Sequence, residues 1–240
     1  MVKVFVDIGS HIGESIVEIL KPKYDFDRVI CIEPSSYAFA KLSAYRDTRL
    51  ELHNWGAWDA NVVGTLFSAG AVGGSLFDDK PQHWNREESV ELRDIKEFFD
   101  ENFSFENQIF LKLNVEGAEY SILNRLFERE QLNWKIEHLL LSLDMPKVPR
   151  LRDKVDNVTK TLQRSGVRYE YRKASDPSES IAIWLKDKTV IYKCSPQKWV
   201  SYFFKLPLYT QARFVFRRVI PKKLWLLLAI KFGPNRLKKF

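Results

Sequence analysis

The chain has 240 residues and a mass of 28.2 kDa, which suits one domain with an appendage better than two full domains. Apolar residues make up 45% of it and charged residues 29%, a balance that excludes a disordered, collagenous or disulfide-built protein. The net charge of +7 is unevenly distributed. Residues 188–240 carry 13 Lys and Arg and no acidic residue, so the remaining 25 basic residues stand against all 31 acidic ones, a balance of −6. We therefore predict a body over 1–188 and a basic tail over 189–240.

The cysteine content and the lengths of the apolar runs indicate the cellular compartment of the protein. Cys31 and Cys194 both sit in strand-like apolar runs, so we expect buried free thiols in a reducing compartment. The first residues lack the features of a signal peptide. The longest apolar run of the tail, 224–230, is far shorter than the roughly 18 residues of a membrane-spanning helix. These features predict a cytoplasmic protein, one that can still bind the inner face of a membrane peripherally.

Strand-like and helix-like segments alternate along the body. Strands are predicted at 2–7, 28–33, 50–55, 108–113, 137–143, 168–172 and 180–185. Helices are predicted at 14–20, 34–45, the second half of 91–102, 116–128 and 150–165, the last with Gly166 as its C-cap. Residues 64–74 are rich in glycine and alanine and predict a hairpin or an open loop. The order predicts an α/β fold with a doubly wound, mostly parallel, seven-stranded sheet and one antiparallel edge strand.

The loop after the first strand carries the main chemical signal. Its sequence Asp7-Ile8-Gly9-Ser10-His11-Ile12-Gly13 places two glycines four residues apart between a strand and a helix. Glycine lets the backbone approach a ligand, and free amides at the start of a helix favour an anionic group such as a carboxylate. The dinucleotide-binding pattern is not met, because Asp7 stands at the position of its first glycine. A tight turn without any ligand is the alternative.

Glu33 strengthens the case for a nucleoside ligand. It lies twenty residues after Gly13, at the end of the second predicted strand, where a carboxylate can accept two hydrogen bonds from a ribose diol. The alternative is an acidic residue that stabilises the N-terminus of a helix starting at Pro34.

Four segments resemble the FkbM-type class I methyltransferases in order and spacing. They are 6–13, Ile32-Glu33-Pro34, Asn54-Trp55-Gly56-Ala57 and Leu111-Lys112-Leu113-Asn114-Val115-Glu116-Gly117-Ala118-Glu119, within a span of roughly 1–185. The resemblance implies a Rossmann-like fold, S-adenosylmethionine as cofactor, and methyl transfer to a hydroxyl group of a sugar, glycan or glycolipid.

The same resemblance implies a set of cofactor-binding residues. Asp7, Gly9 and Gly13, with Ser10 and His11 of the same loop, would frame the methionine end. Glu33, followed by Pro34, would hold the ribose. The residues that would border the adenine are Asn54 with Ala57 or Trp58.

The catalytic base is less clear from the sequence. The family usually has Asp where this chain has Asn114, and an amide cannot act as a general base. Removing the proton of a hydroxyl needs a carboxylate or an imidazole, and the candidates are Glu116, Asp144 and His11, in that order. Their alternatives are, respectively, a helix-stabilising carboxylate, a turn residue and a solvated imidazole. Lys112 is predicted beside the pocket as the partner of a carboxylate, or as a lysine that extends out of a buried strand.

No metal site is predicted, because the four histidines show no paired spacing: His11, His53, His83 and His138. The segment Gly73-Gly74-Ser75 falls where the resemblance places a loop near the cofactor and the acceptor. A flexible hairpin is the alternative there.

The sequence of the tail predicts three helical segments, separated by Pro207 and Pro221. The middle piece has an apolar face opposite Arg213, Arg217 and Arg218, a pattern typical of helices that lie in an anionic membrane interface. Packing against the body or across a dimer is the alternative. Nucleic acid is a less favoured partner of the tail, since the aliphatic run 224–230 would not contribute to binding RNA.

Two functions from different classes follow. The first is an S-adenosylmethionine-dependent O-methyltransferase acting on a glycan or glycolipid hydroxyl at a membrane surface. The second, motivated by Asn114, is a non-catalytic nucleoside-binding protein anchored through its tail. An RNA methyltransferase is less favoured.

Overall fold

The structure is a computed structural model that describes residues 1–81, 84–128, 132–186, 188 and 206–207. The predicted tail helices and Cys194 lie outside these residues. Cys31 is a buried free thiol, as predicted. No helix in the described part of the chain is long and apolar enough to cross a membrane.

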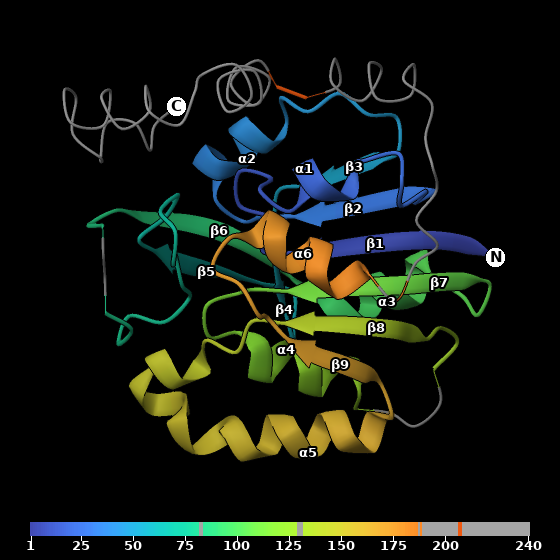
Figure 1. Cartoon of the computed structure of the whole chain (residues 1–240). Helices are drawn as coiled ribbons and strands as arrows, with labels where there is room; N and C mark the ends of the chain where they lie inside the picture. The colour runs from blue at the N-terminus through green and yellow to red at the C-terminus, as the bar shows by residue number, and fades with distance from the viewer. Residues whose placement is uncertain (82–83, 129–131, 187, 189–205, 208–240) are drawn as a thin grey trace, which may run out of the picture.

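The body is built on a six-stranded sheet in which every described pair of neighbours is parallel. The order is β3-β2-β1-β7-β8-β9, and the strands are β1 (Val2–Ile8), β2 (Arg28–Ile32), β3 (Leu50–His53), β7 (Asn107–Leu113), β8 (Ile136–Leu141) and β9 (Arg168–Tyr171). In Figure 1 the carboxyl ends of the strands point to the left. Apolar β-branched and aromatic residues fill the central strands because both faces are covered.

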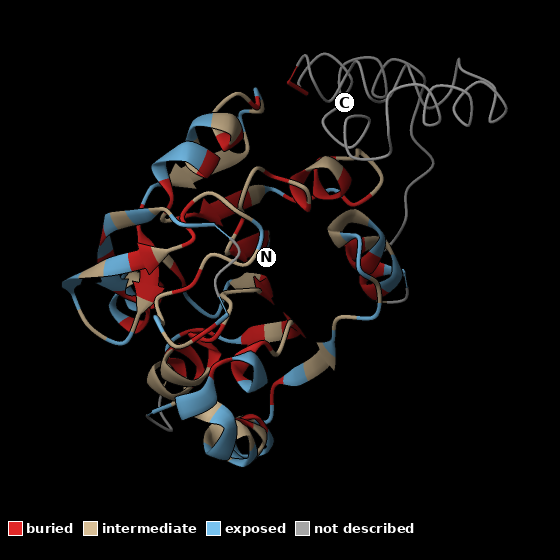
Figure 2. Ribbon diagram, turned by 90° about the vertical axis from the view of Figure 1, so that its left-hand side faces the viewer, coloured by how far each residue is buried: buried red, intermediate tan, exposed pale blue. Residues whose placement is uncertain are grey.

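Helices cover both faces of this sheet (Figure 1). On one face α1 (Ile16–Ile19), α2 (Ser36–Leu42) and α6 (Pro177–Leu185) form a core with Phe5 and Phe110. On the other, α3 (Ile95–Asn102), α4 (Glu119–Leu126) and α5 (Val155–Ser165) pack against Val4, Val6 and Leu111. Alternate residues of β1 thus enter opposite cores, as the two-residue period of a strand requires. Figure 2 shows the buried residues gathered on the strands and on the helix sides that face them.

A second, three-stranded sheet lies between β3 and α3 in sequence. Its order is β4-β6-β5, from β4 (Gly56–Trp58), β5 (Val62–Phe67) and β6 (Glu87–Asp94), with β5 antiparallel to β6. Residues after β5 turn back through a bridge between Phe67 and Ser75, in line with the predicted hairpin. The helix predicted in the second half of 91–102 is confirmed as α3, which begins where the Asp94 carboxylate accepts the amides of Lys96 and Glu97.

The predicted strand at 180–185 is wrong, because these residues belong to α6. Asp176 caps the helix by accepting the Glu179 amide at 3.1 Å, and Pro177 occupies its first turn. The sheet therefore has six strands rather than seven, and the predicted antiparallel edge strand is absent from the described residues. The parallel, doubly wound α/β fold itself is confirmed.

Two 3₁₀ segments, Met145–Lys147 and Pro149–Lys154, connect β8 to α5. Beyond α6, Leu206 is 3% exposed and belongs to the same core as Trp184 and Leu185. One described residue of the predicted tail thus packs on the body.

Candidate active site

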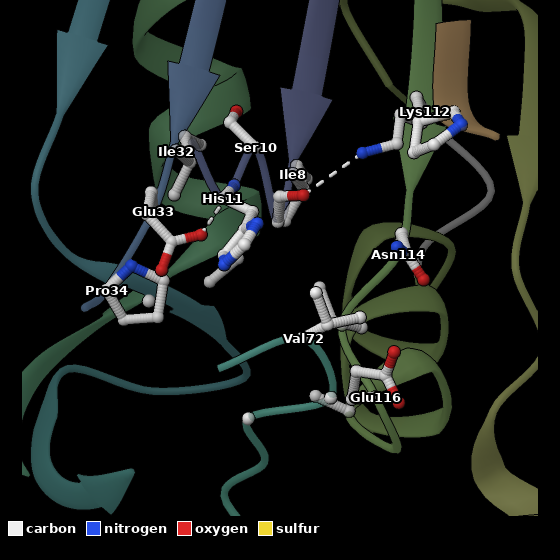
Figure 3. A pocket seen from close by; sticks show the side chains of 18 of the residues that line it. Ile8, Ser10, His11, Ile32, Glu33, Pro34, Val72, Lys112, Asn114 and Glu116 are labelled. Atoms are coloured by element: carbon white, nitrogen blue, oxygen red, sulfur yellow. Dashed lines mark hydrogen bonds between the residues drawn. The ribbon is translucent and has the colours of Figure 1, made fainter. Parts of the chain in front are cut away.

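A cavity of about 280 Å³ opens at the carboxyl ends of β1, β2 and β7. Its walls come from loops far apart in sequence: 8–11 after β1, 32–34 after β2, 114–116 after β7, 71–74 after β5, and Arg172, Ser175 and Pro177 after β9. Ligands of open parallel sheets bind at this edge. Figure 3 shows Glu33 and His11 on one side of the cavity and Lys112, Asn114 and Glu116 on the other.

The glycine loop is shaped by a close backbone contact. Gly9 has a φ of +80°, and a Cβ there would lie 1.9 Å from the carbonyl oxygen of Asn114, so only glycine fits. The amides of Gly9 and Ser10 donate to the Ile32 carbonyl at 3.0 and 3.1 Å, and the Gly13 amide donates to the Ser10 carbonyl at 2.9 Å. The free amides expected here are therefore already engaged, and the following helix α1 begins only at Ile16.

Gly13 does not line the cavity. It has a φ of +88°, and a Cβ there would lie 2.7 Å from the ring of Tyr45. Its role in the described structure is to let the loop pack against Leu42, the last residue of α2, and against Tyr45 just beyond that helix.

Asp7 and Lys112 form a buried ion pair between two neighbouring strands. They face each other across β1 and β7, with 2.6 Å between the Lys112 Nζ and the Asp7 Oδ1. The same Nζ donates to the Gly9 carbonyl at 3.0 Å. Burial raises the pKa of Asp7 and the charge of Lys112 opposes the rise. Lys112 lines the cavity as predicted, with Asp7 as its carboxylate partner, whereas Asp7 itself lies behind the cavity wall.

Among the described residues, two backbone amides hold the carboxylate of Glu33 in place. Its Oε2 accepts the amide of His11 at 2.8 Å and its Oε1 accepts the amide of Ser35 at 2.9 Å. Burial raises the pKa of Glu33, and these two hydrogen bonds oppose the rise. A carboxylate oxygen can accept more than one hydrogen bond, so both oxygens keep acceptor capacity at the cavity wall.

His11 is tied into the pocket rather than solvated. Its Nδ1 lies 2.8 Å from the Glu14 carboxylate and its Nε2 lies 3.4 Å from the Gly70 carbonyl oxygen. Two acceptors facing the two ring nitrogens suit the imidazolium, in which both nitrogens donate. Burial alone lowers the pKa of His11, but the hydrogen bond and charge of Glu14 outweigh it and the pKa lies above its ordinary value. This arrangement disfavours His11 as a general base, because an imidazolium has no free nitrogen lone pair to accept a proton.

The remaining base candidates differ in their access to the cavity. Glu116 lines it, in a left-handed conformation with a φ of +53°, and its carboxylate lies 2.9 Å from the Nζ of Lys80. Asp144 does not line it; its carboxylate lies 2.6 Å from the Nζ of Lys147. The Oδ1 of Asn114, also in the cavity lining, is buried and has no hydrogen-bond partner in the described structure.

The adenine-bordering residues are only partly brought together. Of these three, Ala57 lines the cavity, as does Pro34 next to Glu33. Asn54 does not, and its Nδ2 instead donates to the carbonyls of Glu33 and Pro34 at 2.9 and 3.1 Å, which fixes the loop after β2. Trp58 packs against the ring of Phe77 with 6.2 Å between centroids.

Besides Glu14, the cavity-lining partner of His11, sequence reasoning missed three charged residues at this site. Lys80 is buried and bridges Glu116 to the carbonyl of Gly73. Glu119 is fully buried, and its Oε1 accepts the amides of Gly117 at 3.2 Å and of Asp144 at 3.3 Å. The third is Arg172, at the cavity wall. Only Glu119 lay within a segment that the family resemblance had singled out.

The predicted loop at 73–75 is part of the site. Gly73 and Gly74 line the cavity, and the Oγ of Ser75 donates to the Glu116 carbonyl at 2.7 Å. No cluster of three or more side chains able to ligate a metal occurs in the part of the chain that the structure describes.

The parallel sheet and the cavity at its carboxyl edge define a Rossmann-like α/β fold of the kind found in class I methyltransferases. Comparison with known protein families matches residues 7–169 to the Methyltransferase FkbM domain. The chain therefore belongs to the FkbM methyltransferase family, as its motifs predicted, and it is a methyltransferase by that membership. No curated protein and no solved structure gives a match.

Proposed function

We propose that this methyltransferase uses S-adenosylmethionine and transfers its methyl group to a hydroxyl of a sugar, glycan or glycolipid. The observation that carries the cofactor assignment is Glu33, whose two oxygens are fixed by the His11 and Ser35 amides and still have acceptor capacity. A ribose presents two adjacent hydroxyl donors, which match these two oxygens.

The rest of the cavity suits the same cofactor. Its lining includes apolar side chains beside Glu33 for an adenosine, among them Ile32, Ala57 and Leu66. On the other side, the buried Oδ1 of Asn114 has no partner among the described residues and can accept from an ammonium group. When bound, the cofactor supplies an electrophilic methyl group on a sulfonium centre.

Within the proposed reaction, the chain has to orient the acceptor hydroxyl and take up its proton. Glu116 is the carboxylate candidate that lines the cavity, and the amines of Lys80 and Lys147 face it. Lys80, at 2.9 Å, fixes the direction of its carboxylate. The left-handed Glu116 backbone, whose carbonyl is held by Ser75, sets where the side chain leaves the loop. We expect Glu116→Gln to lower kcat while leaving cofactor affinity unchanged.

The test of the cofactor assignment is calorimetric titration with S-adenosylmethionine and S-adenosylhomocysteine. We expect both to bind, and Glu33→Ala to weaken both at least about tenfold, because hydrogen bonds to a charged group contribute about 1.5–3 kcal/mol each. Glu91→Ala is the matched control, since Glu91 is an exposed β6 carboxylate paired with Arg93. A folded Glu33→Ala variant with wild-type affinity would contradict the assignment.

The acceptor class is proposed from the family resemblance and the tail. Residues 188–240 carry 13 basic and no acidic side chains, which would favour an anionic membrane surface and hence an amphiphilic acceptor. Cosedimentation of the whole chain with anionic and with uncharged vesicles tests this. Binding to the anionic vesicles alone, lost at high salt, is expected; equal recovery with both would remove the argument.

A non-catalytic nucleoside-binding protein is the second candidate. Asn114 favours it, because the usual acidic residue is replaced by an amide. Consumption of the methyl donor in the presence of a mixed pool of sugar acceptors would exclude it.

A further inference from the structure

The charged side chains around the cavity are mostly neutralised by one another. His11 pairs with Glu14, Lys112 with Asp7, and Glu116 with Lys80. Two lining charges remain that form no ion pair with any described residue: the carboxylate of Glu33 and the guanidinium of Arg172. A cavity with one uncompensated negative group and one uncompensated positive group suits a ligand that offers hydroxyl donors at one end and an anion at the other.

Arg172 is built rigidly into the cavity wall. It directly follows the edge strand β9, and its amide donates to the Leu141 carbonyl at 2.9 Å. Its Nε donates to the Ala174 carbonyl at 2.7 Å and its Nη2 to the Ser175 carbonyl. The Oγ of Ser180, in α6, accepts the Ala174 amide at 3.2 Å and donates to the Ala174 carbonyl at 2.7 Å. These contacts fix the guanidinium plane and leave the Nη1 protons without a protein partner in the described structure.

The position of Arg172 points to the methionine end of the site. A small hollow next to the main cavity is lined by Lys112, Asn114 and Arg172 together, and Glu33 is not part of it. In Figure 3 Lys112 and Asn114 stand across the cavity from Glu33. If Glu33 takes the ribose, Arg172 lies on the side where the amino-acid part of the cofactor extends.

The usual donors for a carboxylate are not free here. The amides of Gly9, Ser10, His11 and Gly13 all donate within the protein, and Lys112 is engaged by Asp7 and the Gly9 carbonyl. An α-carboxylate entering the cavity therefore needs another donor. A guanidinium suits it well, because its N–H groups can bond both carboxylate oxygens.

We propose that Arg172 binds the α-carboxylate of the cofactor's methionine moiety, with the Oδ1 of Asn114 accepting from the neighbouring ammonium group. This inference rests on the proposed use of S-adenosylmethionine. Arg172 lies beyond residues 7–169, which the family domain covers, so the assignment comes from this chain's own geometry.

The experiment compares two ligands that differ at the amino-acid end. S-Adenosylhomocysteine carries the carboxylate, whereas 5′-methylthioadenosine keeps the adenine, ribose and thioether and lacks the amino acid. Both are titrated calorimetrically into wild type, Arg172→Met, Arg172→Lys and Arg168→Met. Arg168 is the matched control, an exposed β9 arginine paired with Glu137 and outside the cavity lining. The melting temperature of each variant without ligand reports its folding.

We expect Arg172→Met to weaken S-adenosylhomocysteine binding by about 10- to 100-fold, the range for losing a hydrogen bond to a charged group. Its affinity for 5′-methylthioadenosine should match wild type. Arg172→Lys should fall in between for the first ligand, and Arg168→Met should change neither affinity.

Two results would overturn the inference alone: unchanged S-adenosylhomocysteine binding by Arg172→Met, or an equal loss for both ligands, which would show general damage to the pocket. If wild type binds neither ligand, the proposed function fails and the inference fails with it. If Arg172→Met does not fold, Arg172→Lys carries the comparison, since it keeps the charge but loses the planar fork.

Discussion

Substituting Gly9 by alanine separates backbone strain from steric conflict at the cofactor loop. Gly9 and Gly166 both have a positive φ, +80° and +66°. At Gly9 a Cβ would lie 1.9 Å from the Asn114 carbonyl oxygen, whereas at Gly166 nothing lies within 4 Å. The two substitutions thus share the conformational penalty and differ in the clash, which is relieved only if β1 and β7 move apart.

The conformational penalty is about 1–2 kcal/mol for a non-glycine residue in the left-handed region. The overlap at Gly9 adds about 1–3 kcal/mol, the usual range for forcing extra atoms into a packed site. At about 2–4 °C per kcal/mol for a chain of this size, we expect Gly9→Ala to lower the melting temperature by roughly 4–20 °C and Gly166→Ala by roughly 2–8 °C, with Gly9→Ala the larger of the two when both are measured together.

Thermal unfolding followed by circular dichroism provides the measurement, with both variants in one buffer and without ligand. Gly9→Ala should also weaken cofactor binding, because the clash displaces Asn114 in the cavity wall. Equal destabilisation by the two substitutions would refute the reasoning, since it would mean that the contact with the Asn114 carbonyl does not constrain the loop.

Three further predictions concern buried or capping charges. Burial, reinforced by the charge of Asp144, raises the pKa of Glu119 to about 8. The contribution of the protonated Glu119 to stability is therefore complete below about pH 4.5 and is lost as the pH rises to about 8. Glu119→Gln should flatten the dependence of the melting temperature on pH between these two values. Lys112→Met leaves Asp7 buried without its partner and should destabilise the protein by about 3–5 kcal/mol at neutral pH, less in acid, as denaturant titration will show. Asp176→Ala removes the N-cap of α6 and should lower the free energy of unfolding by about 1 kcal/mol; no change would argue against that cap.

Elements whose burial follows a simple period could be predicted from the sequence. The central strands are apolar runs such as 109–111 because both faces are covered, and Gly166 ends α5 in the left-handed conformation expected of a C-cap glycine. The segment 180–185 failed for a physical reason. Ile181, Trp184 and Leu185 are buried while Ile183 is 42% exposed, a helical spacing that a short apolar run hides and that the preceding Asp176-Pro177 start signal would have revealed.

The binding site could be predicted only where a local motif marks it. Gly9 and Glu33 follow strands directly, so their place at the sheet edge could be predicted from the chain order. Lys80 lies in the β5–β6 connection and Arg172 in the β9–α6 connection, and nothing in the sequence around either residue indicates that it reaches this edge of the sheet. The positions of both side chains at the cavity depend on tertiary folding alone.

The burial of Leu206 has a practical consequence for where the chain can be shortened. A version ending at Lys188 would keep every described strand and helix, yet it would remove Leu206 from the core that α1, α2 and α6 form on that face of the sheet. Exposing the area that one leucine covers costs about 1.5–3 kcal/mol, a sizeable part of a typical folding free energy. For expression or crystallisation, the smallest piece that retains this contact ends beyond Leu206, well past the last helix of the body.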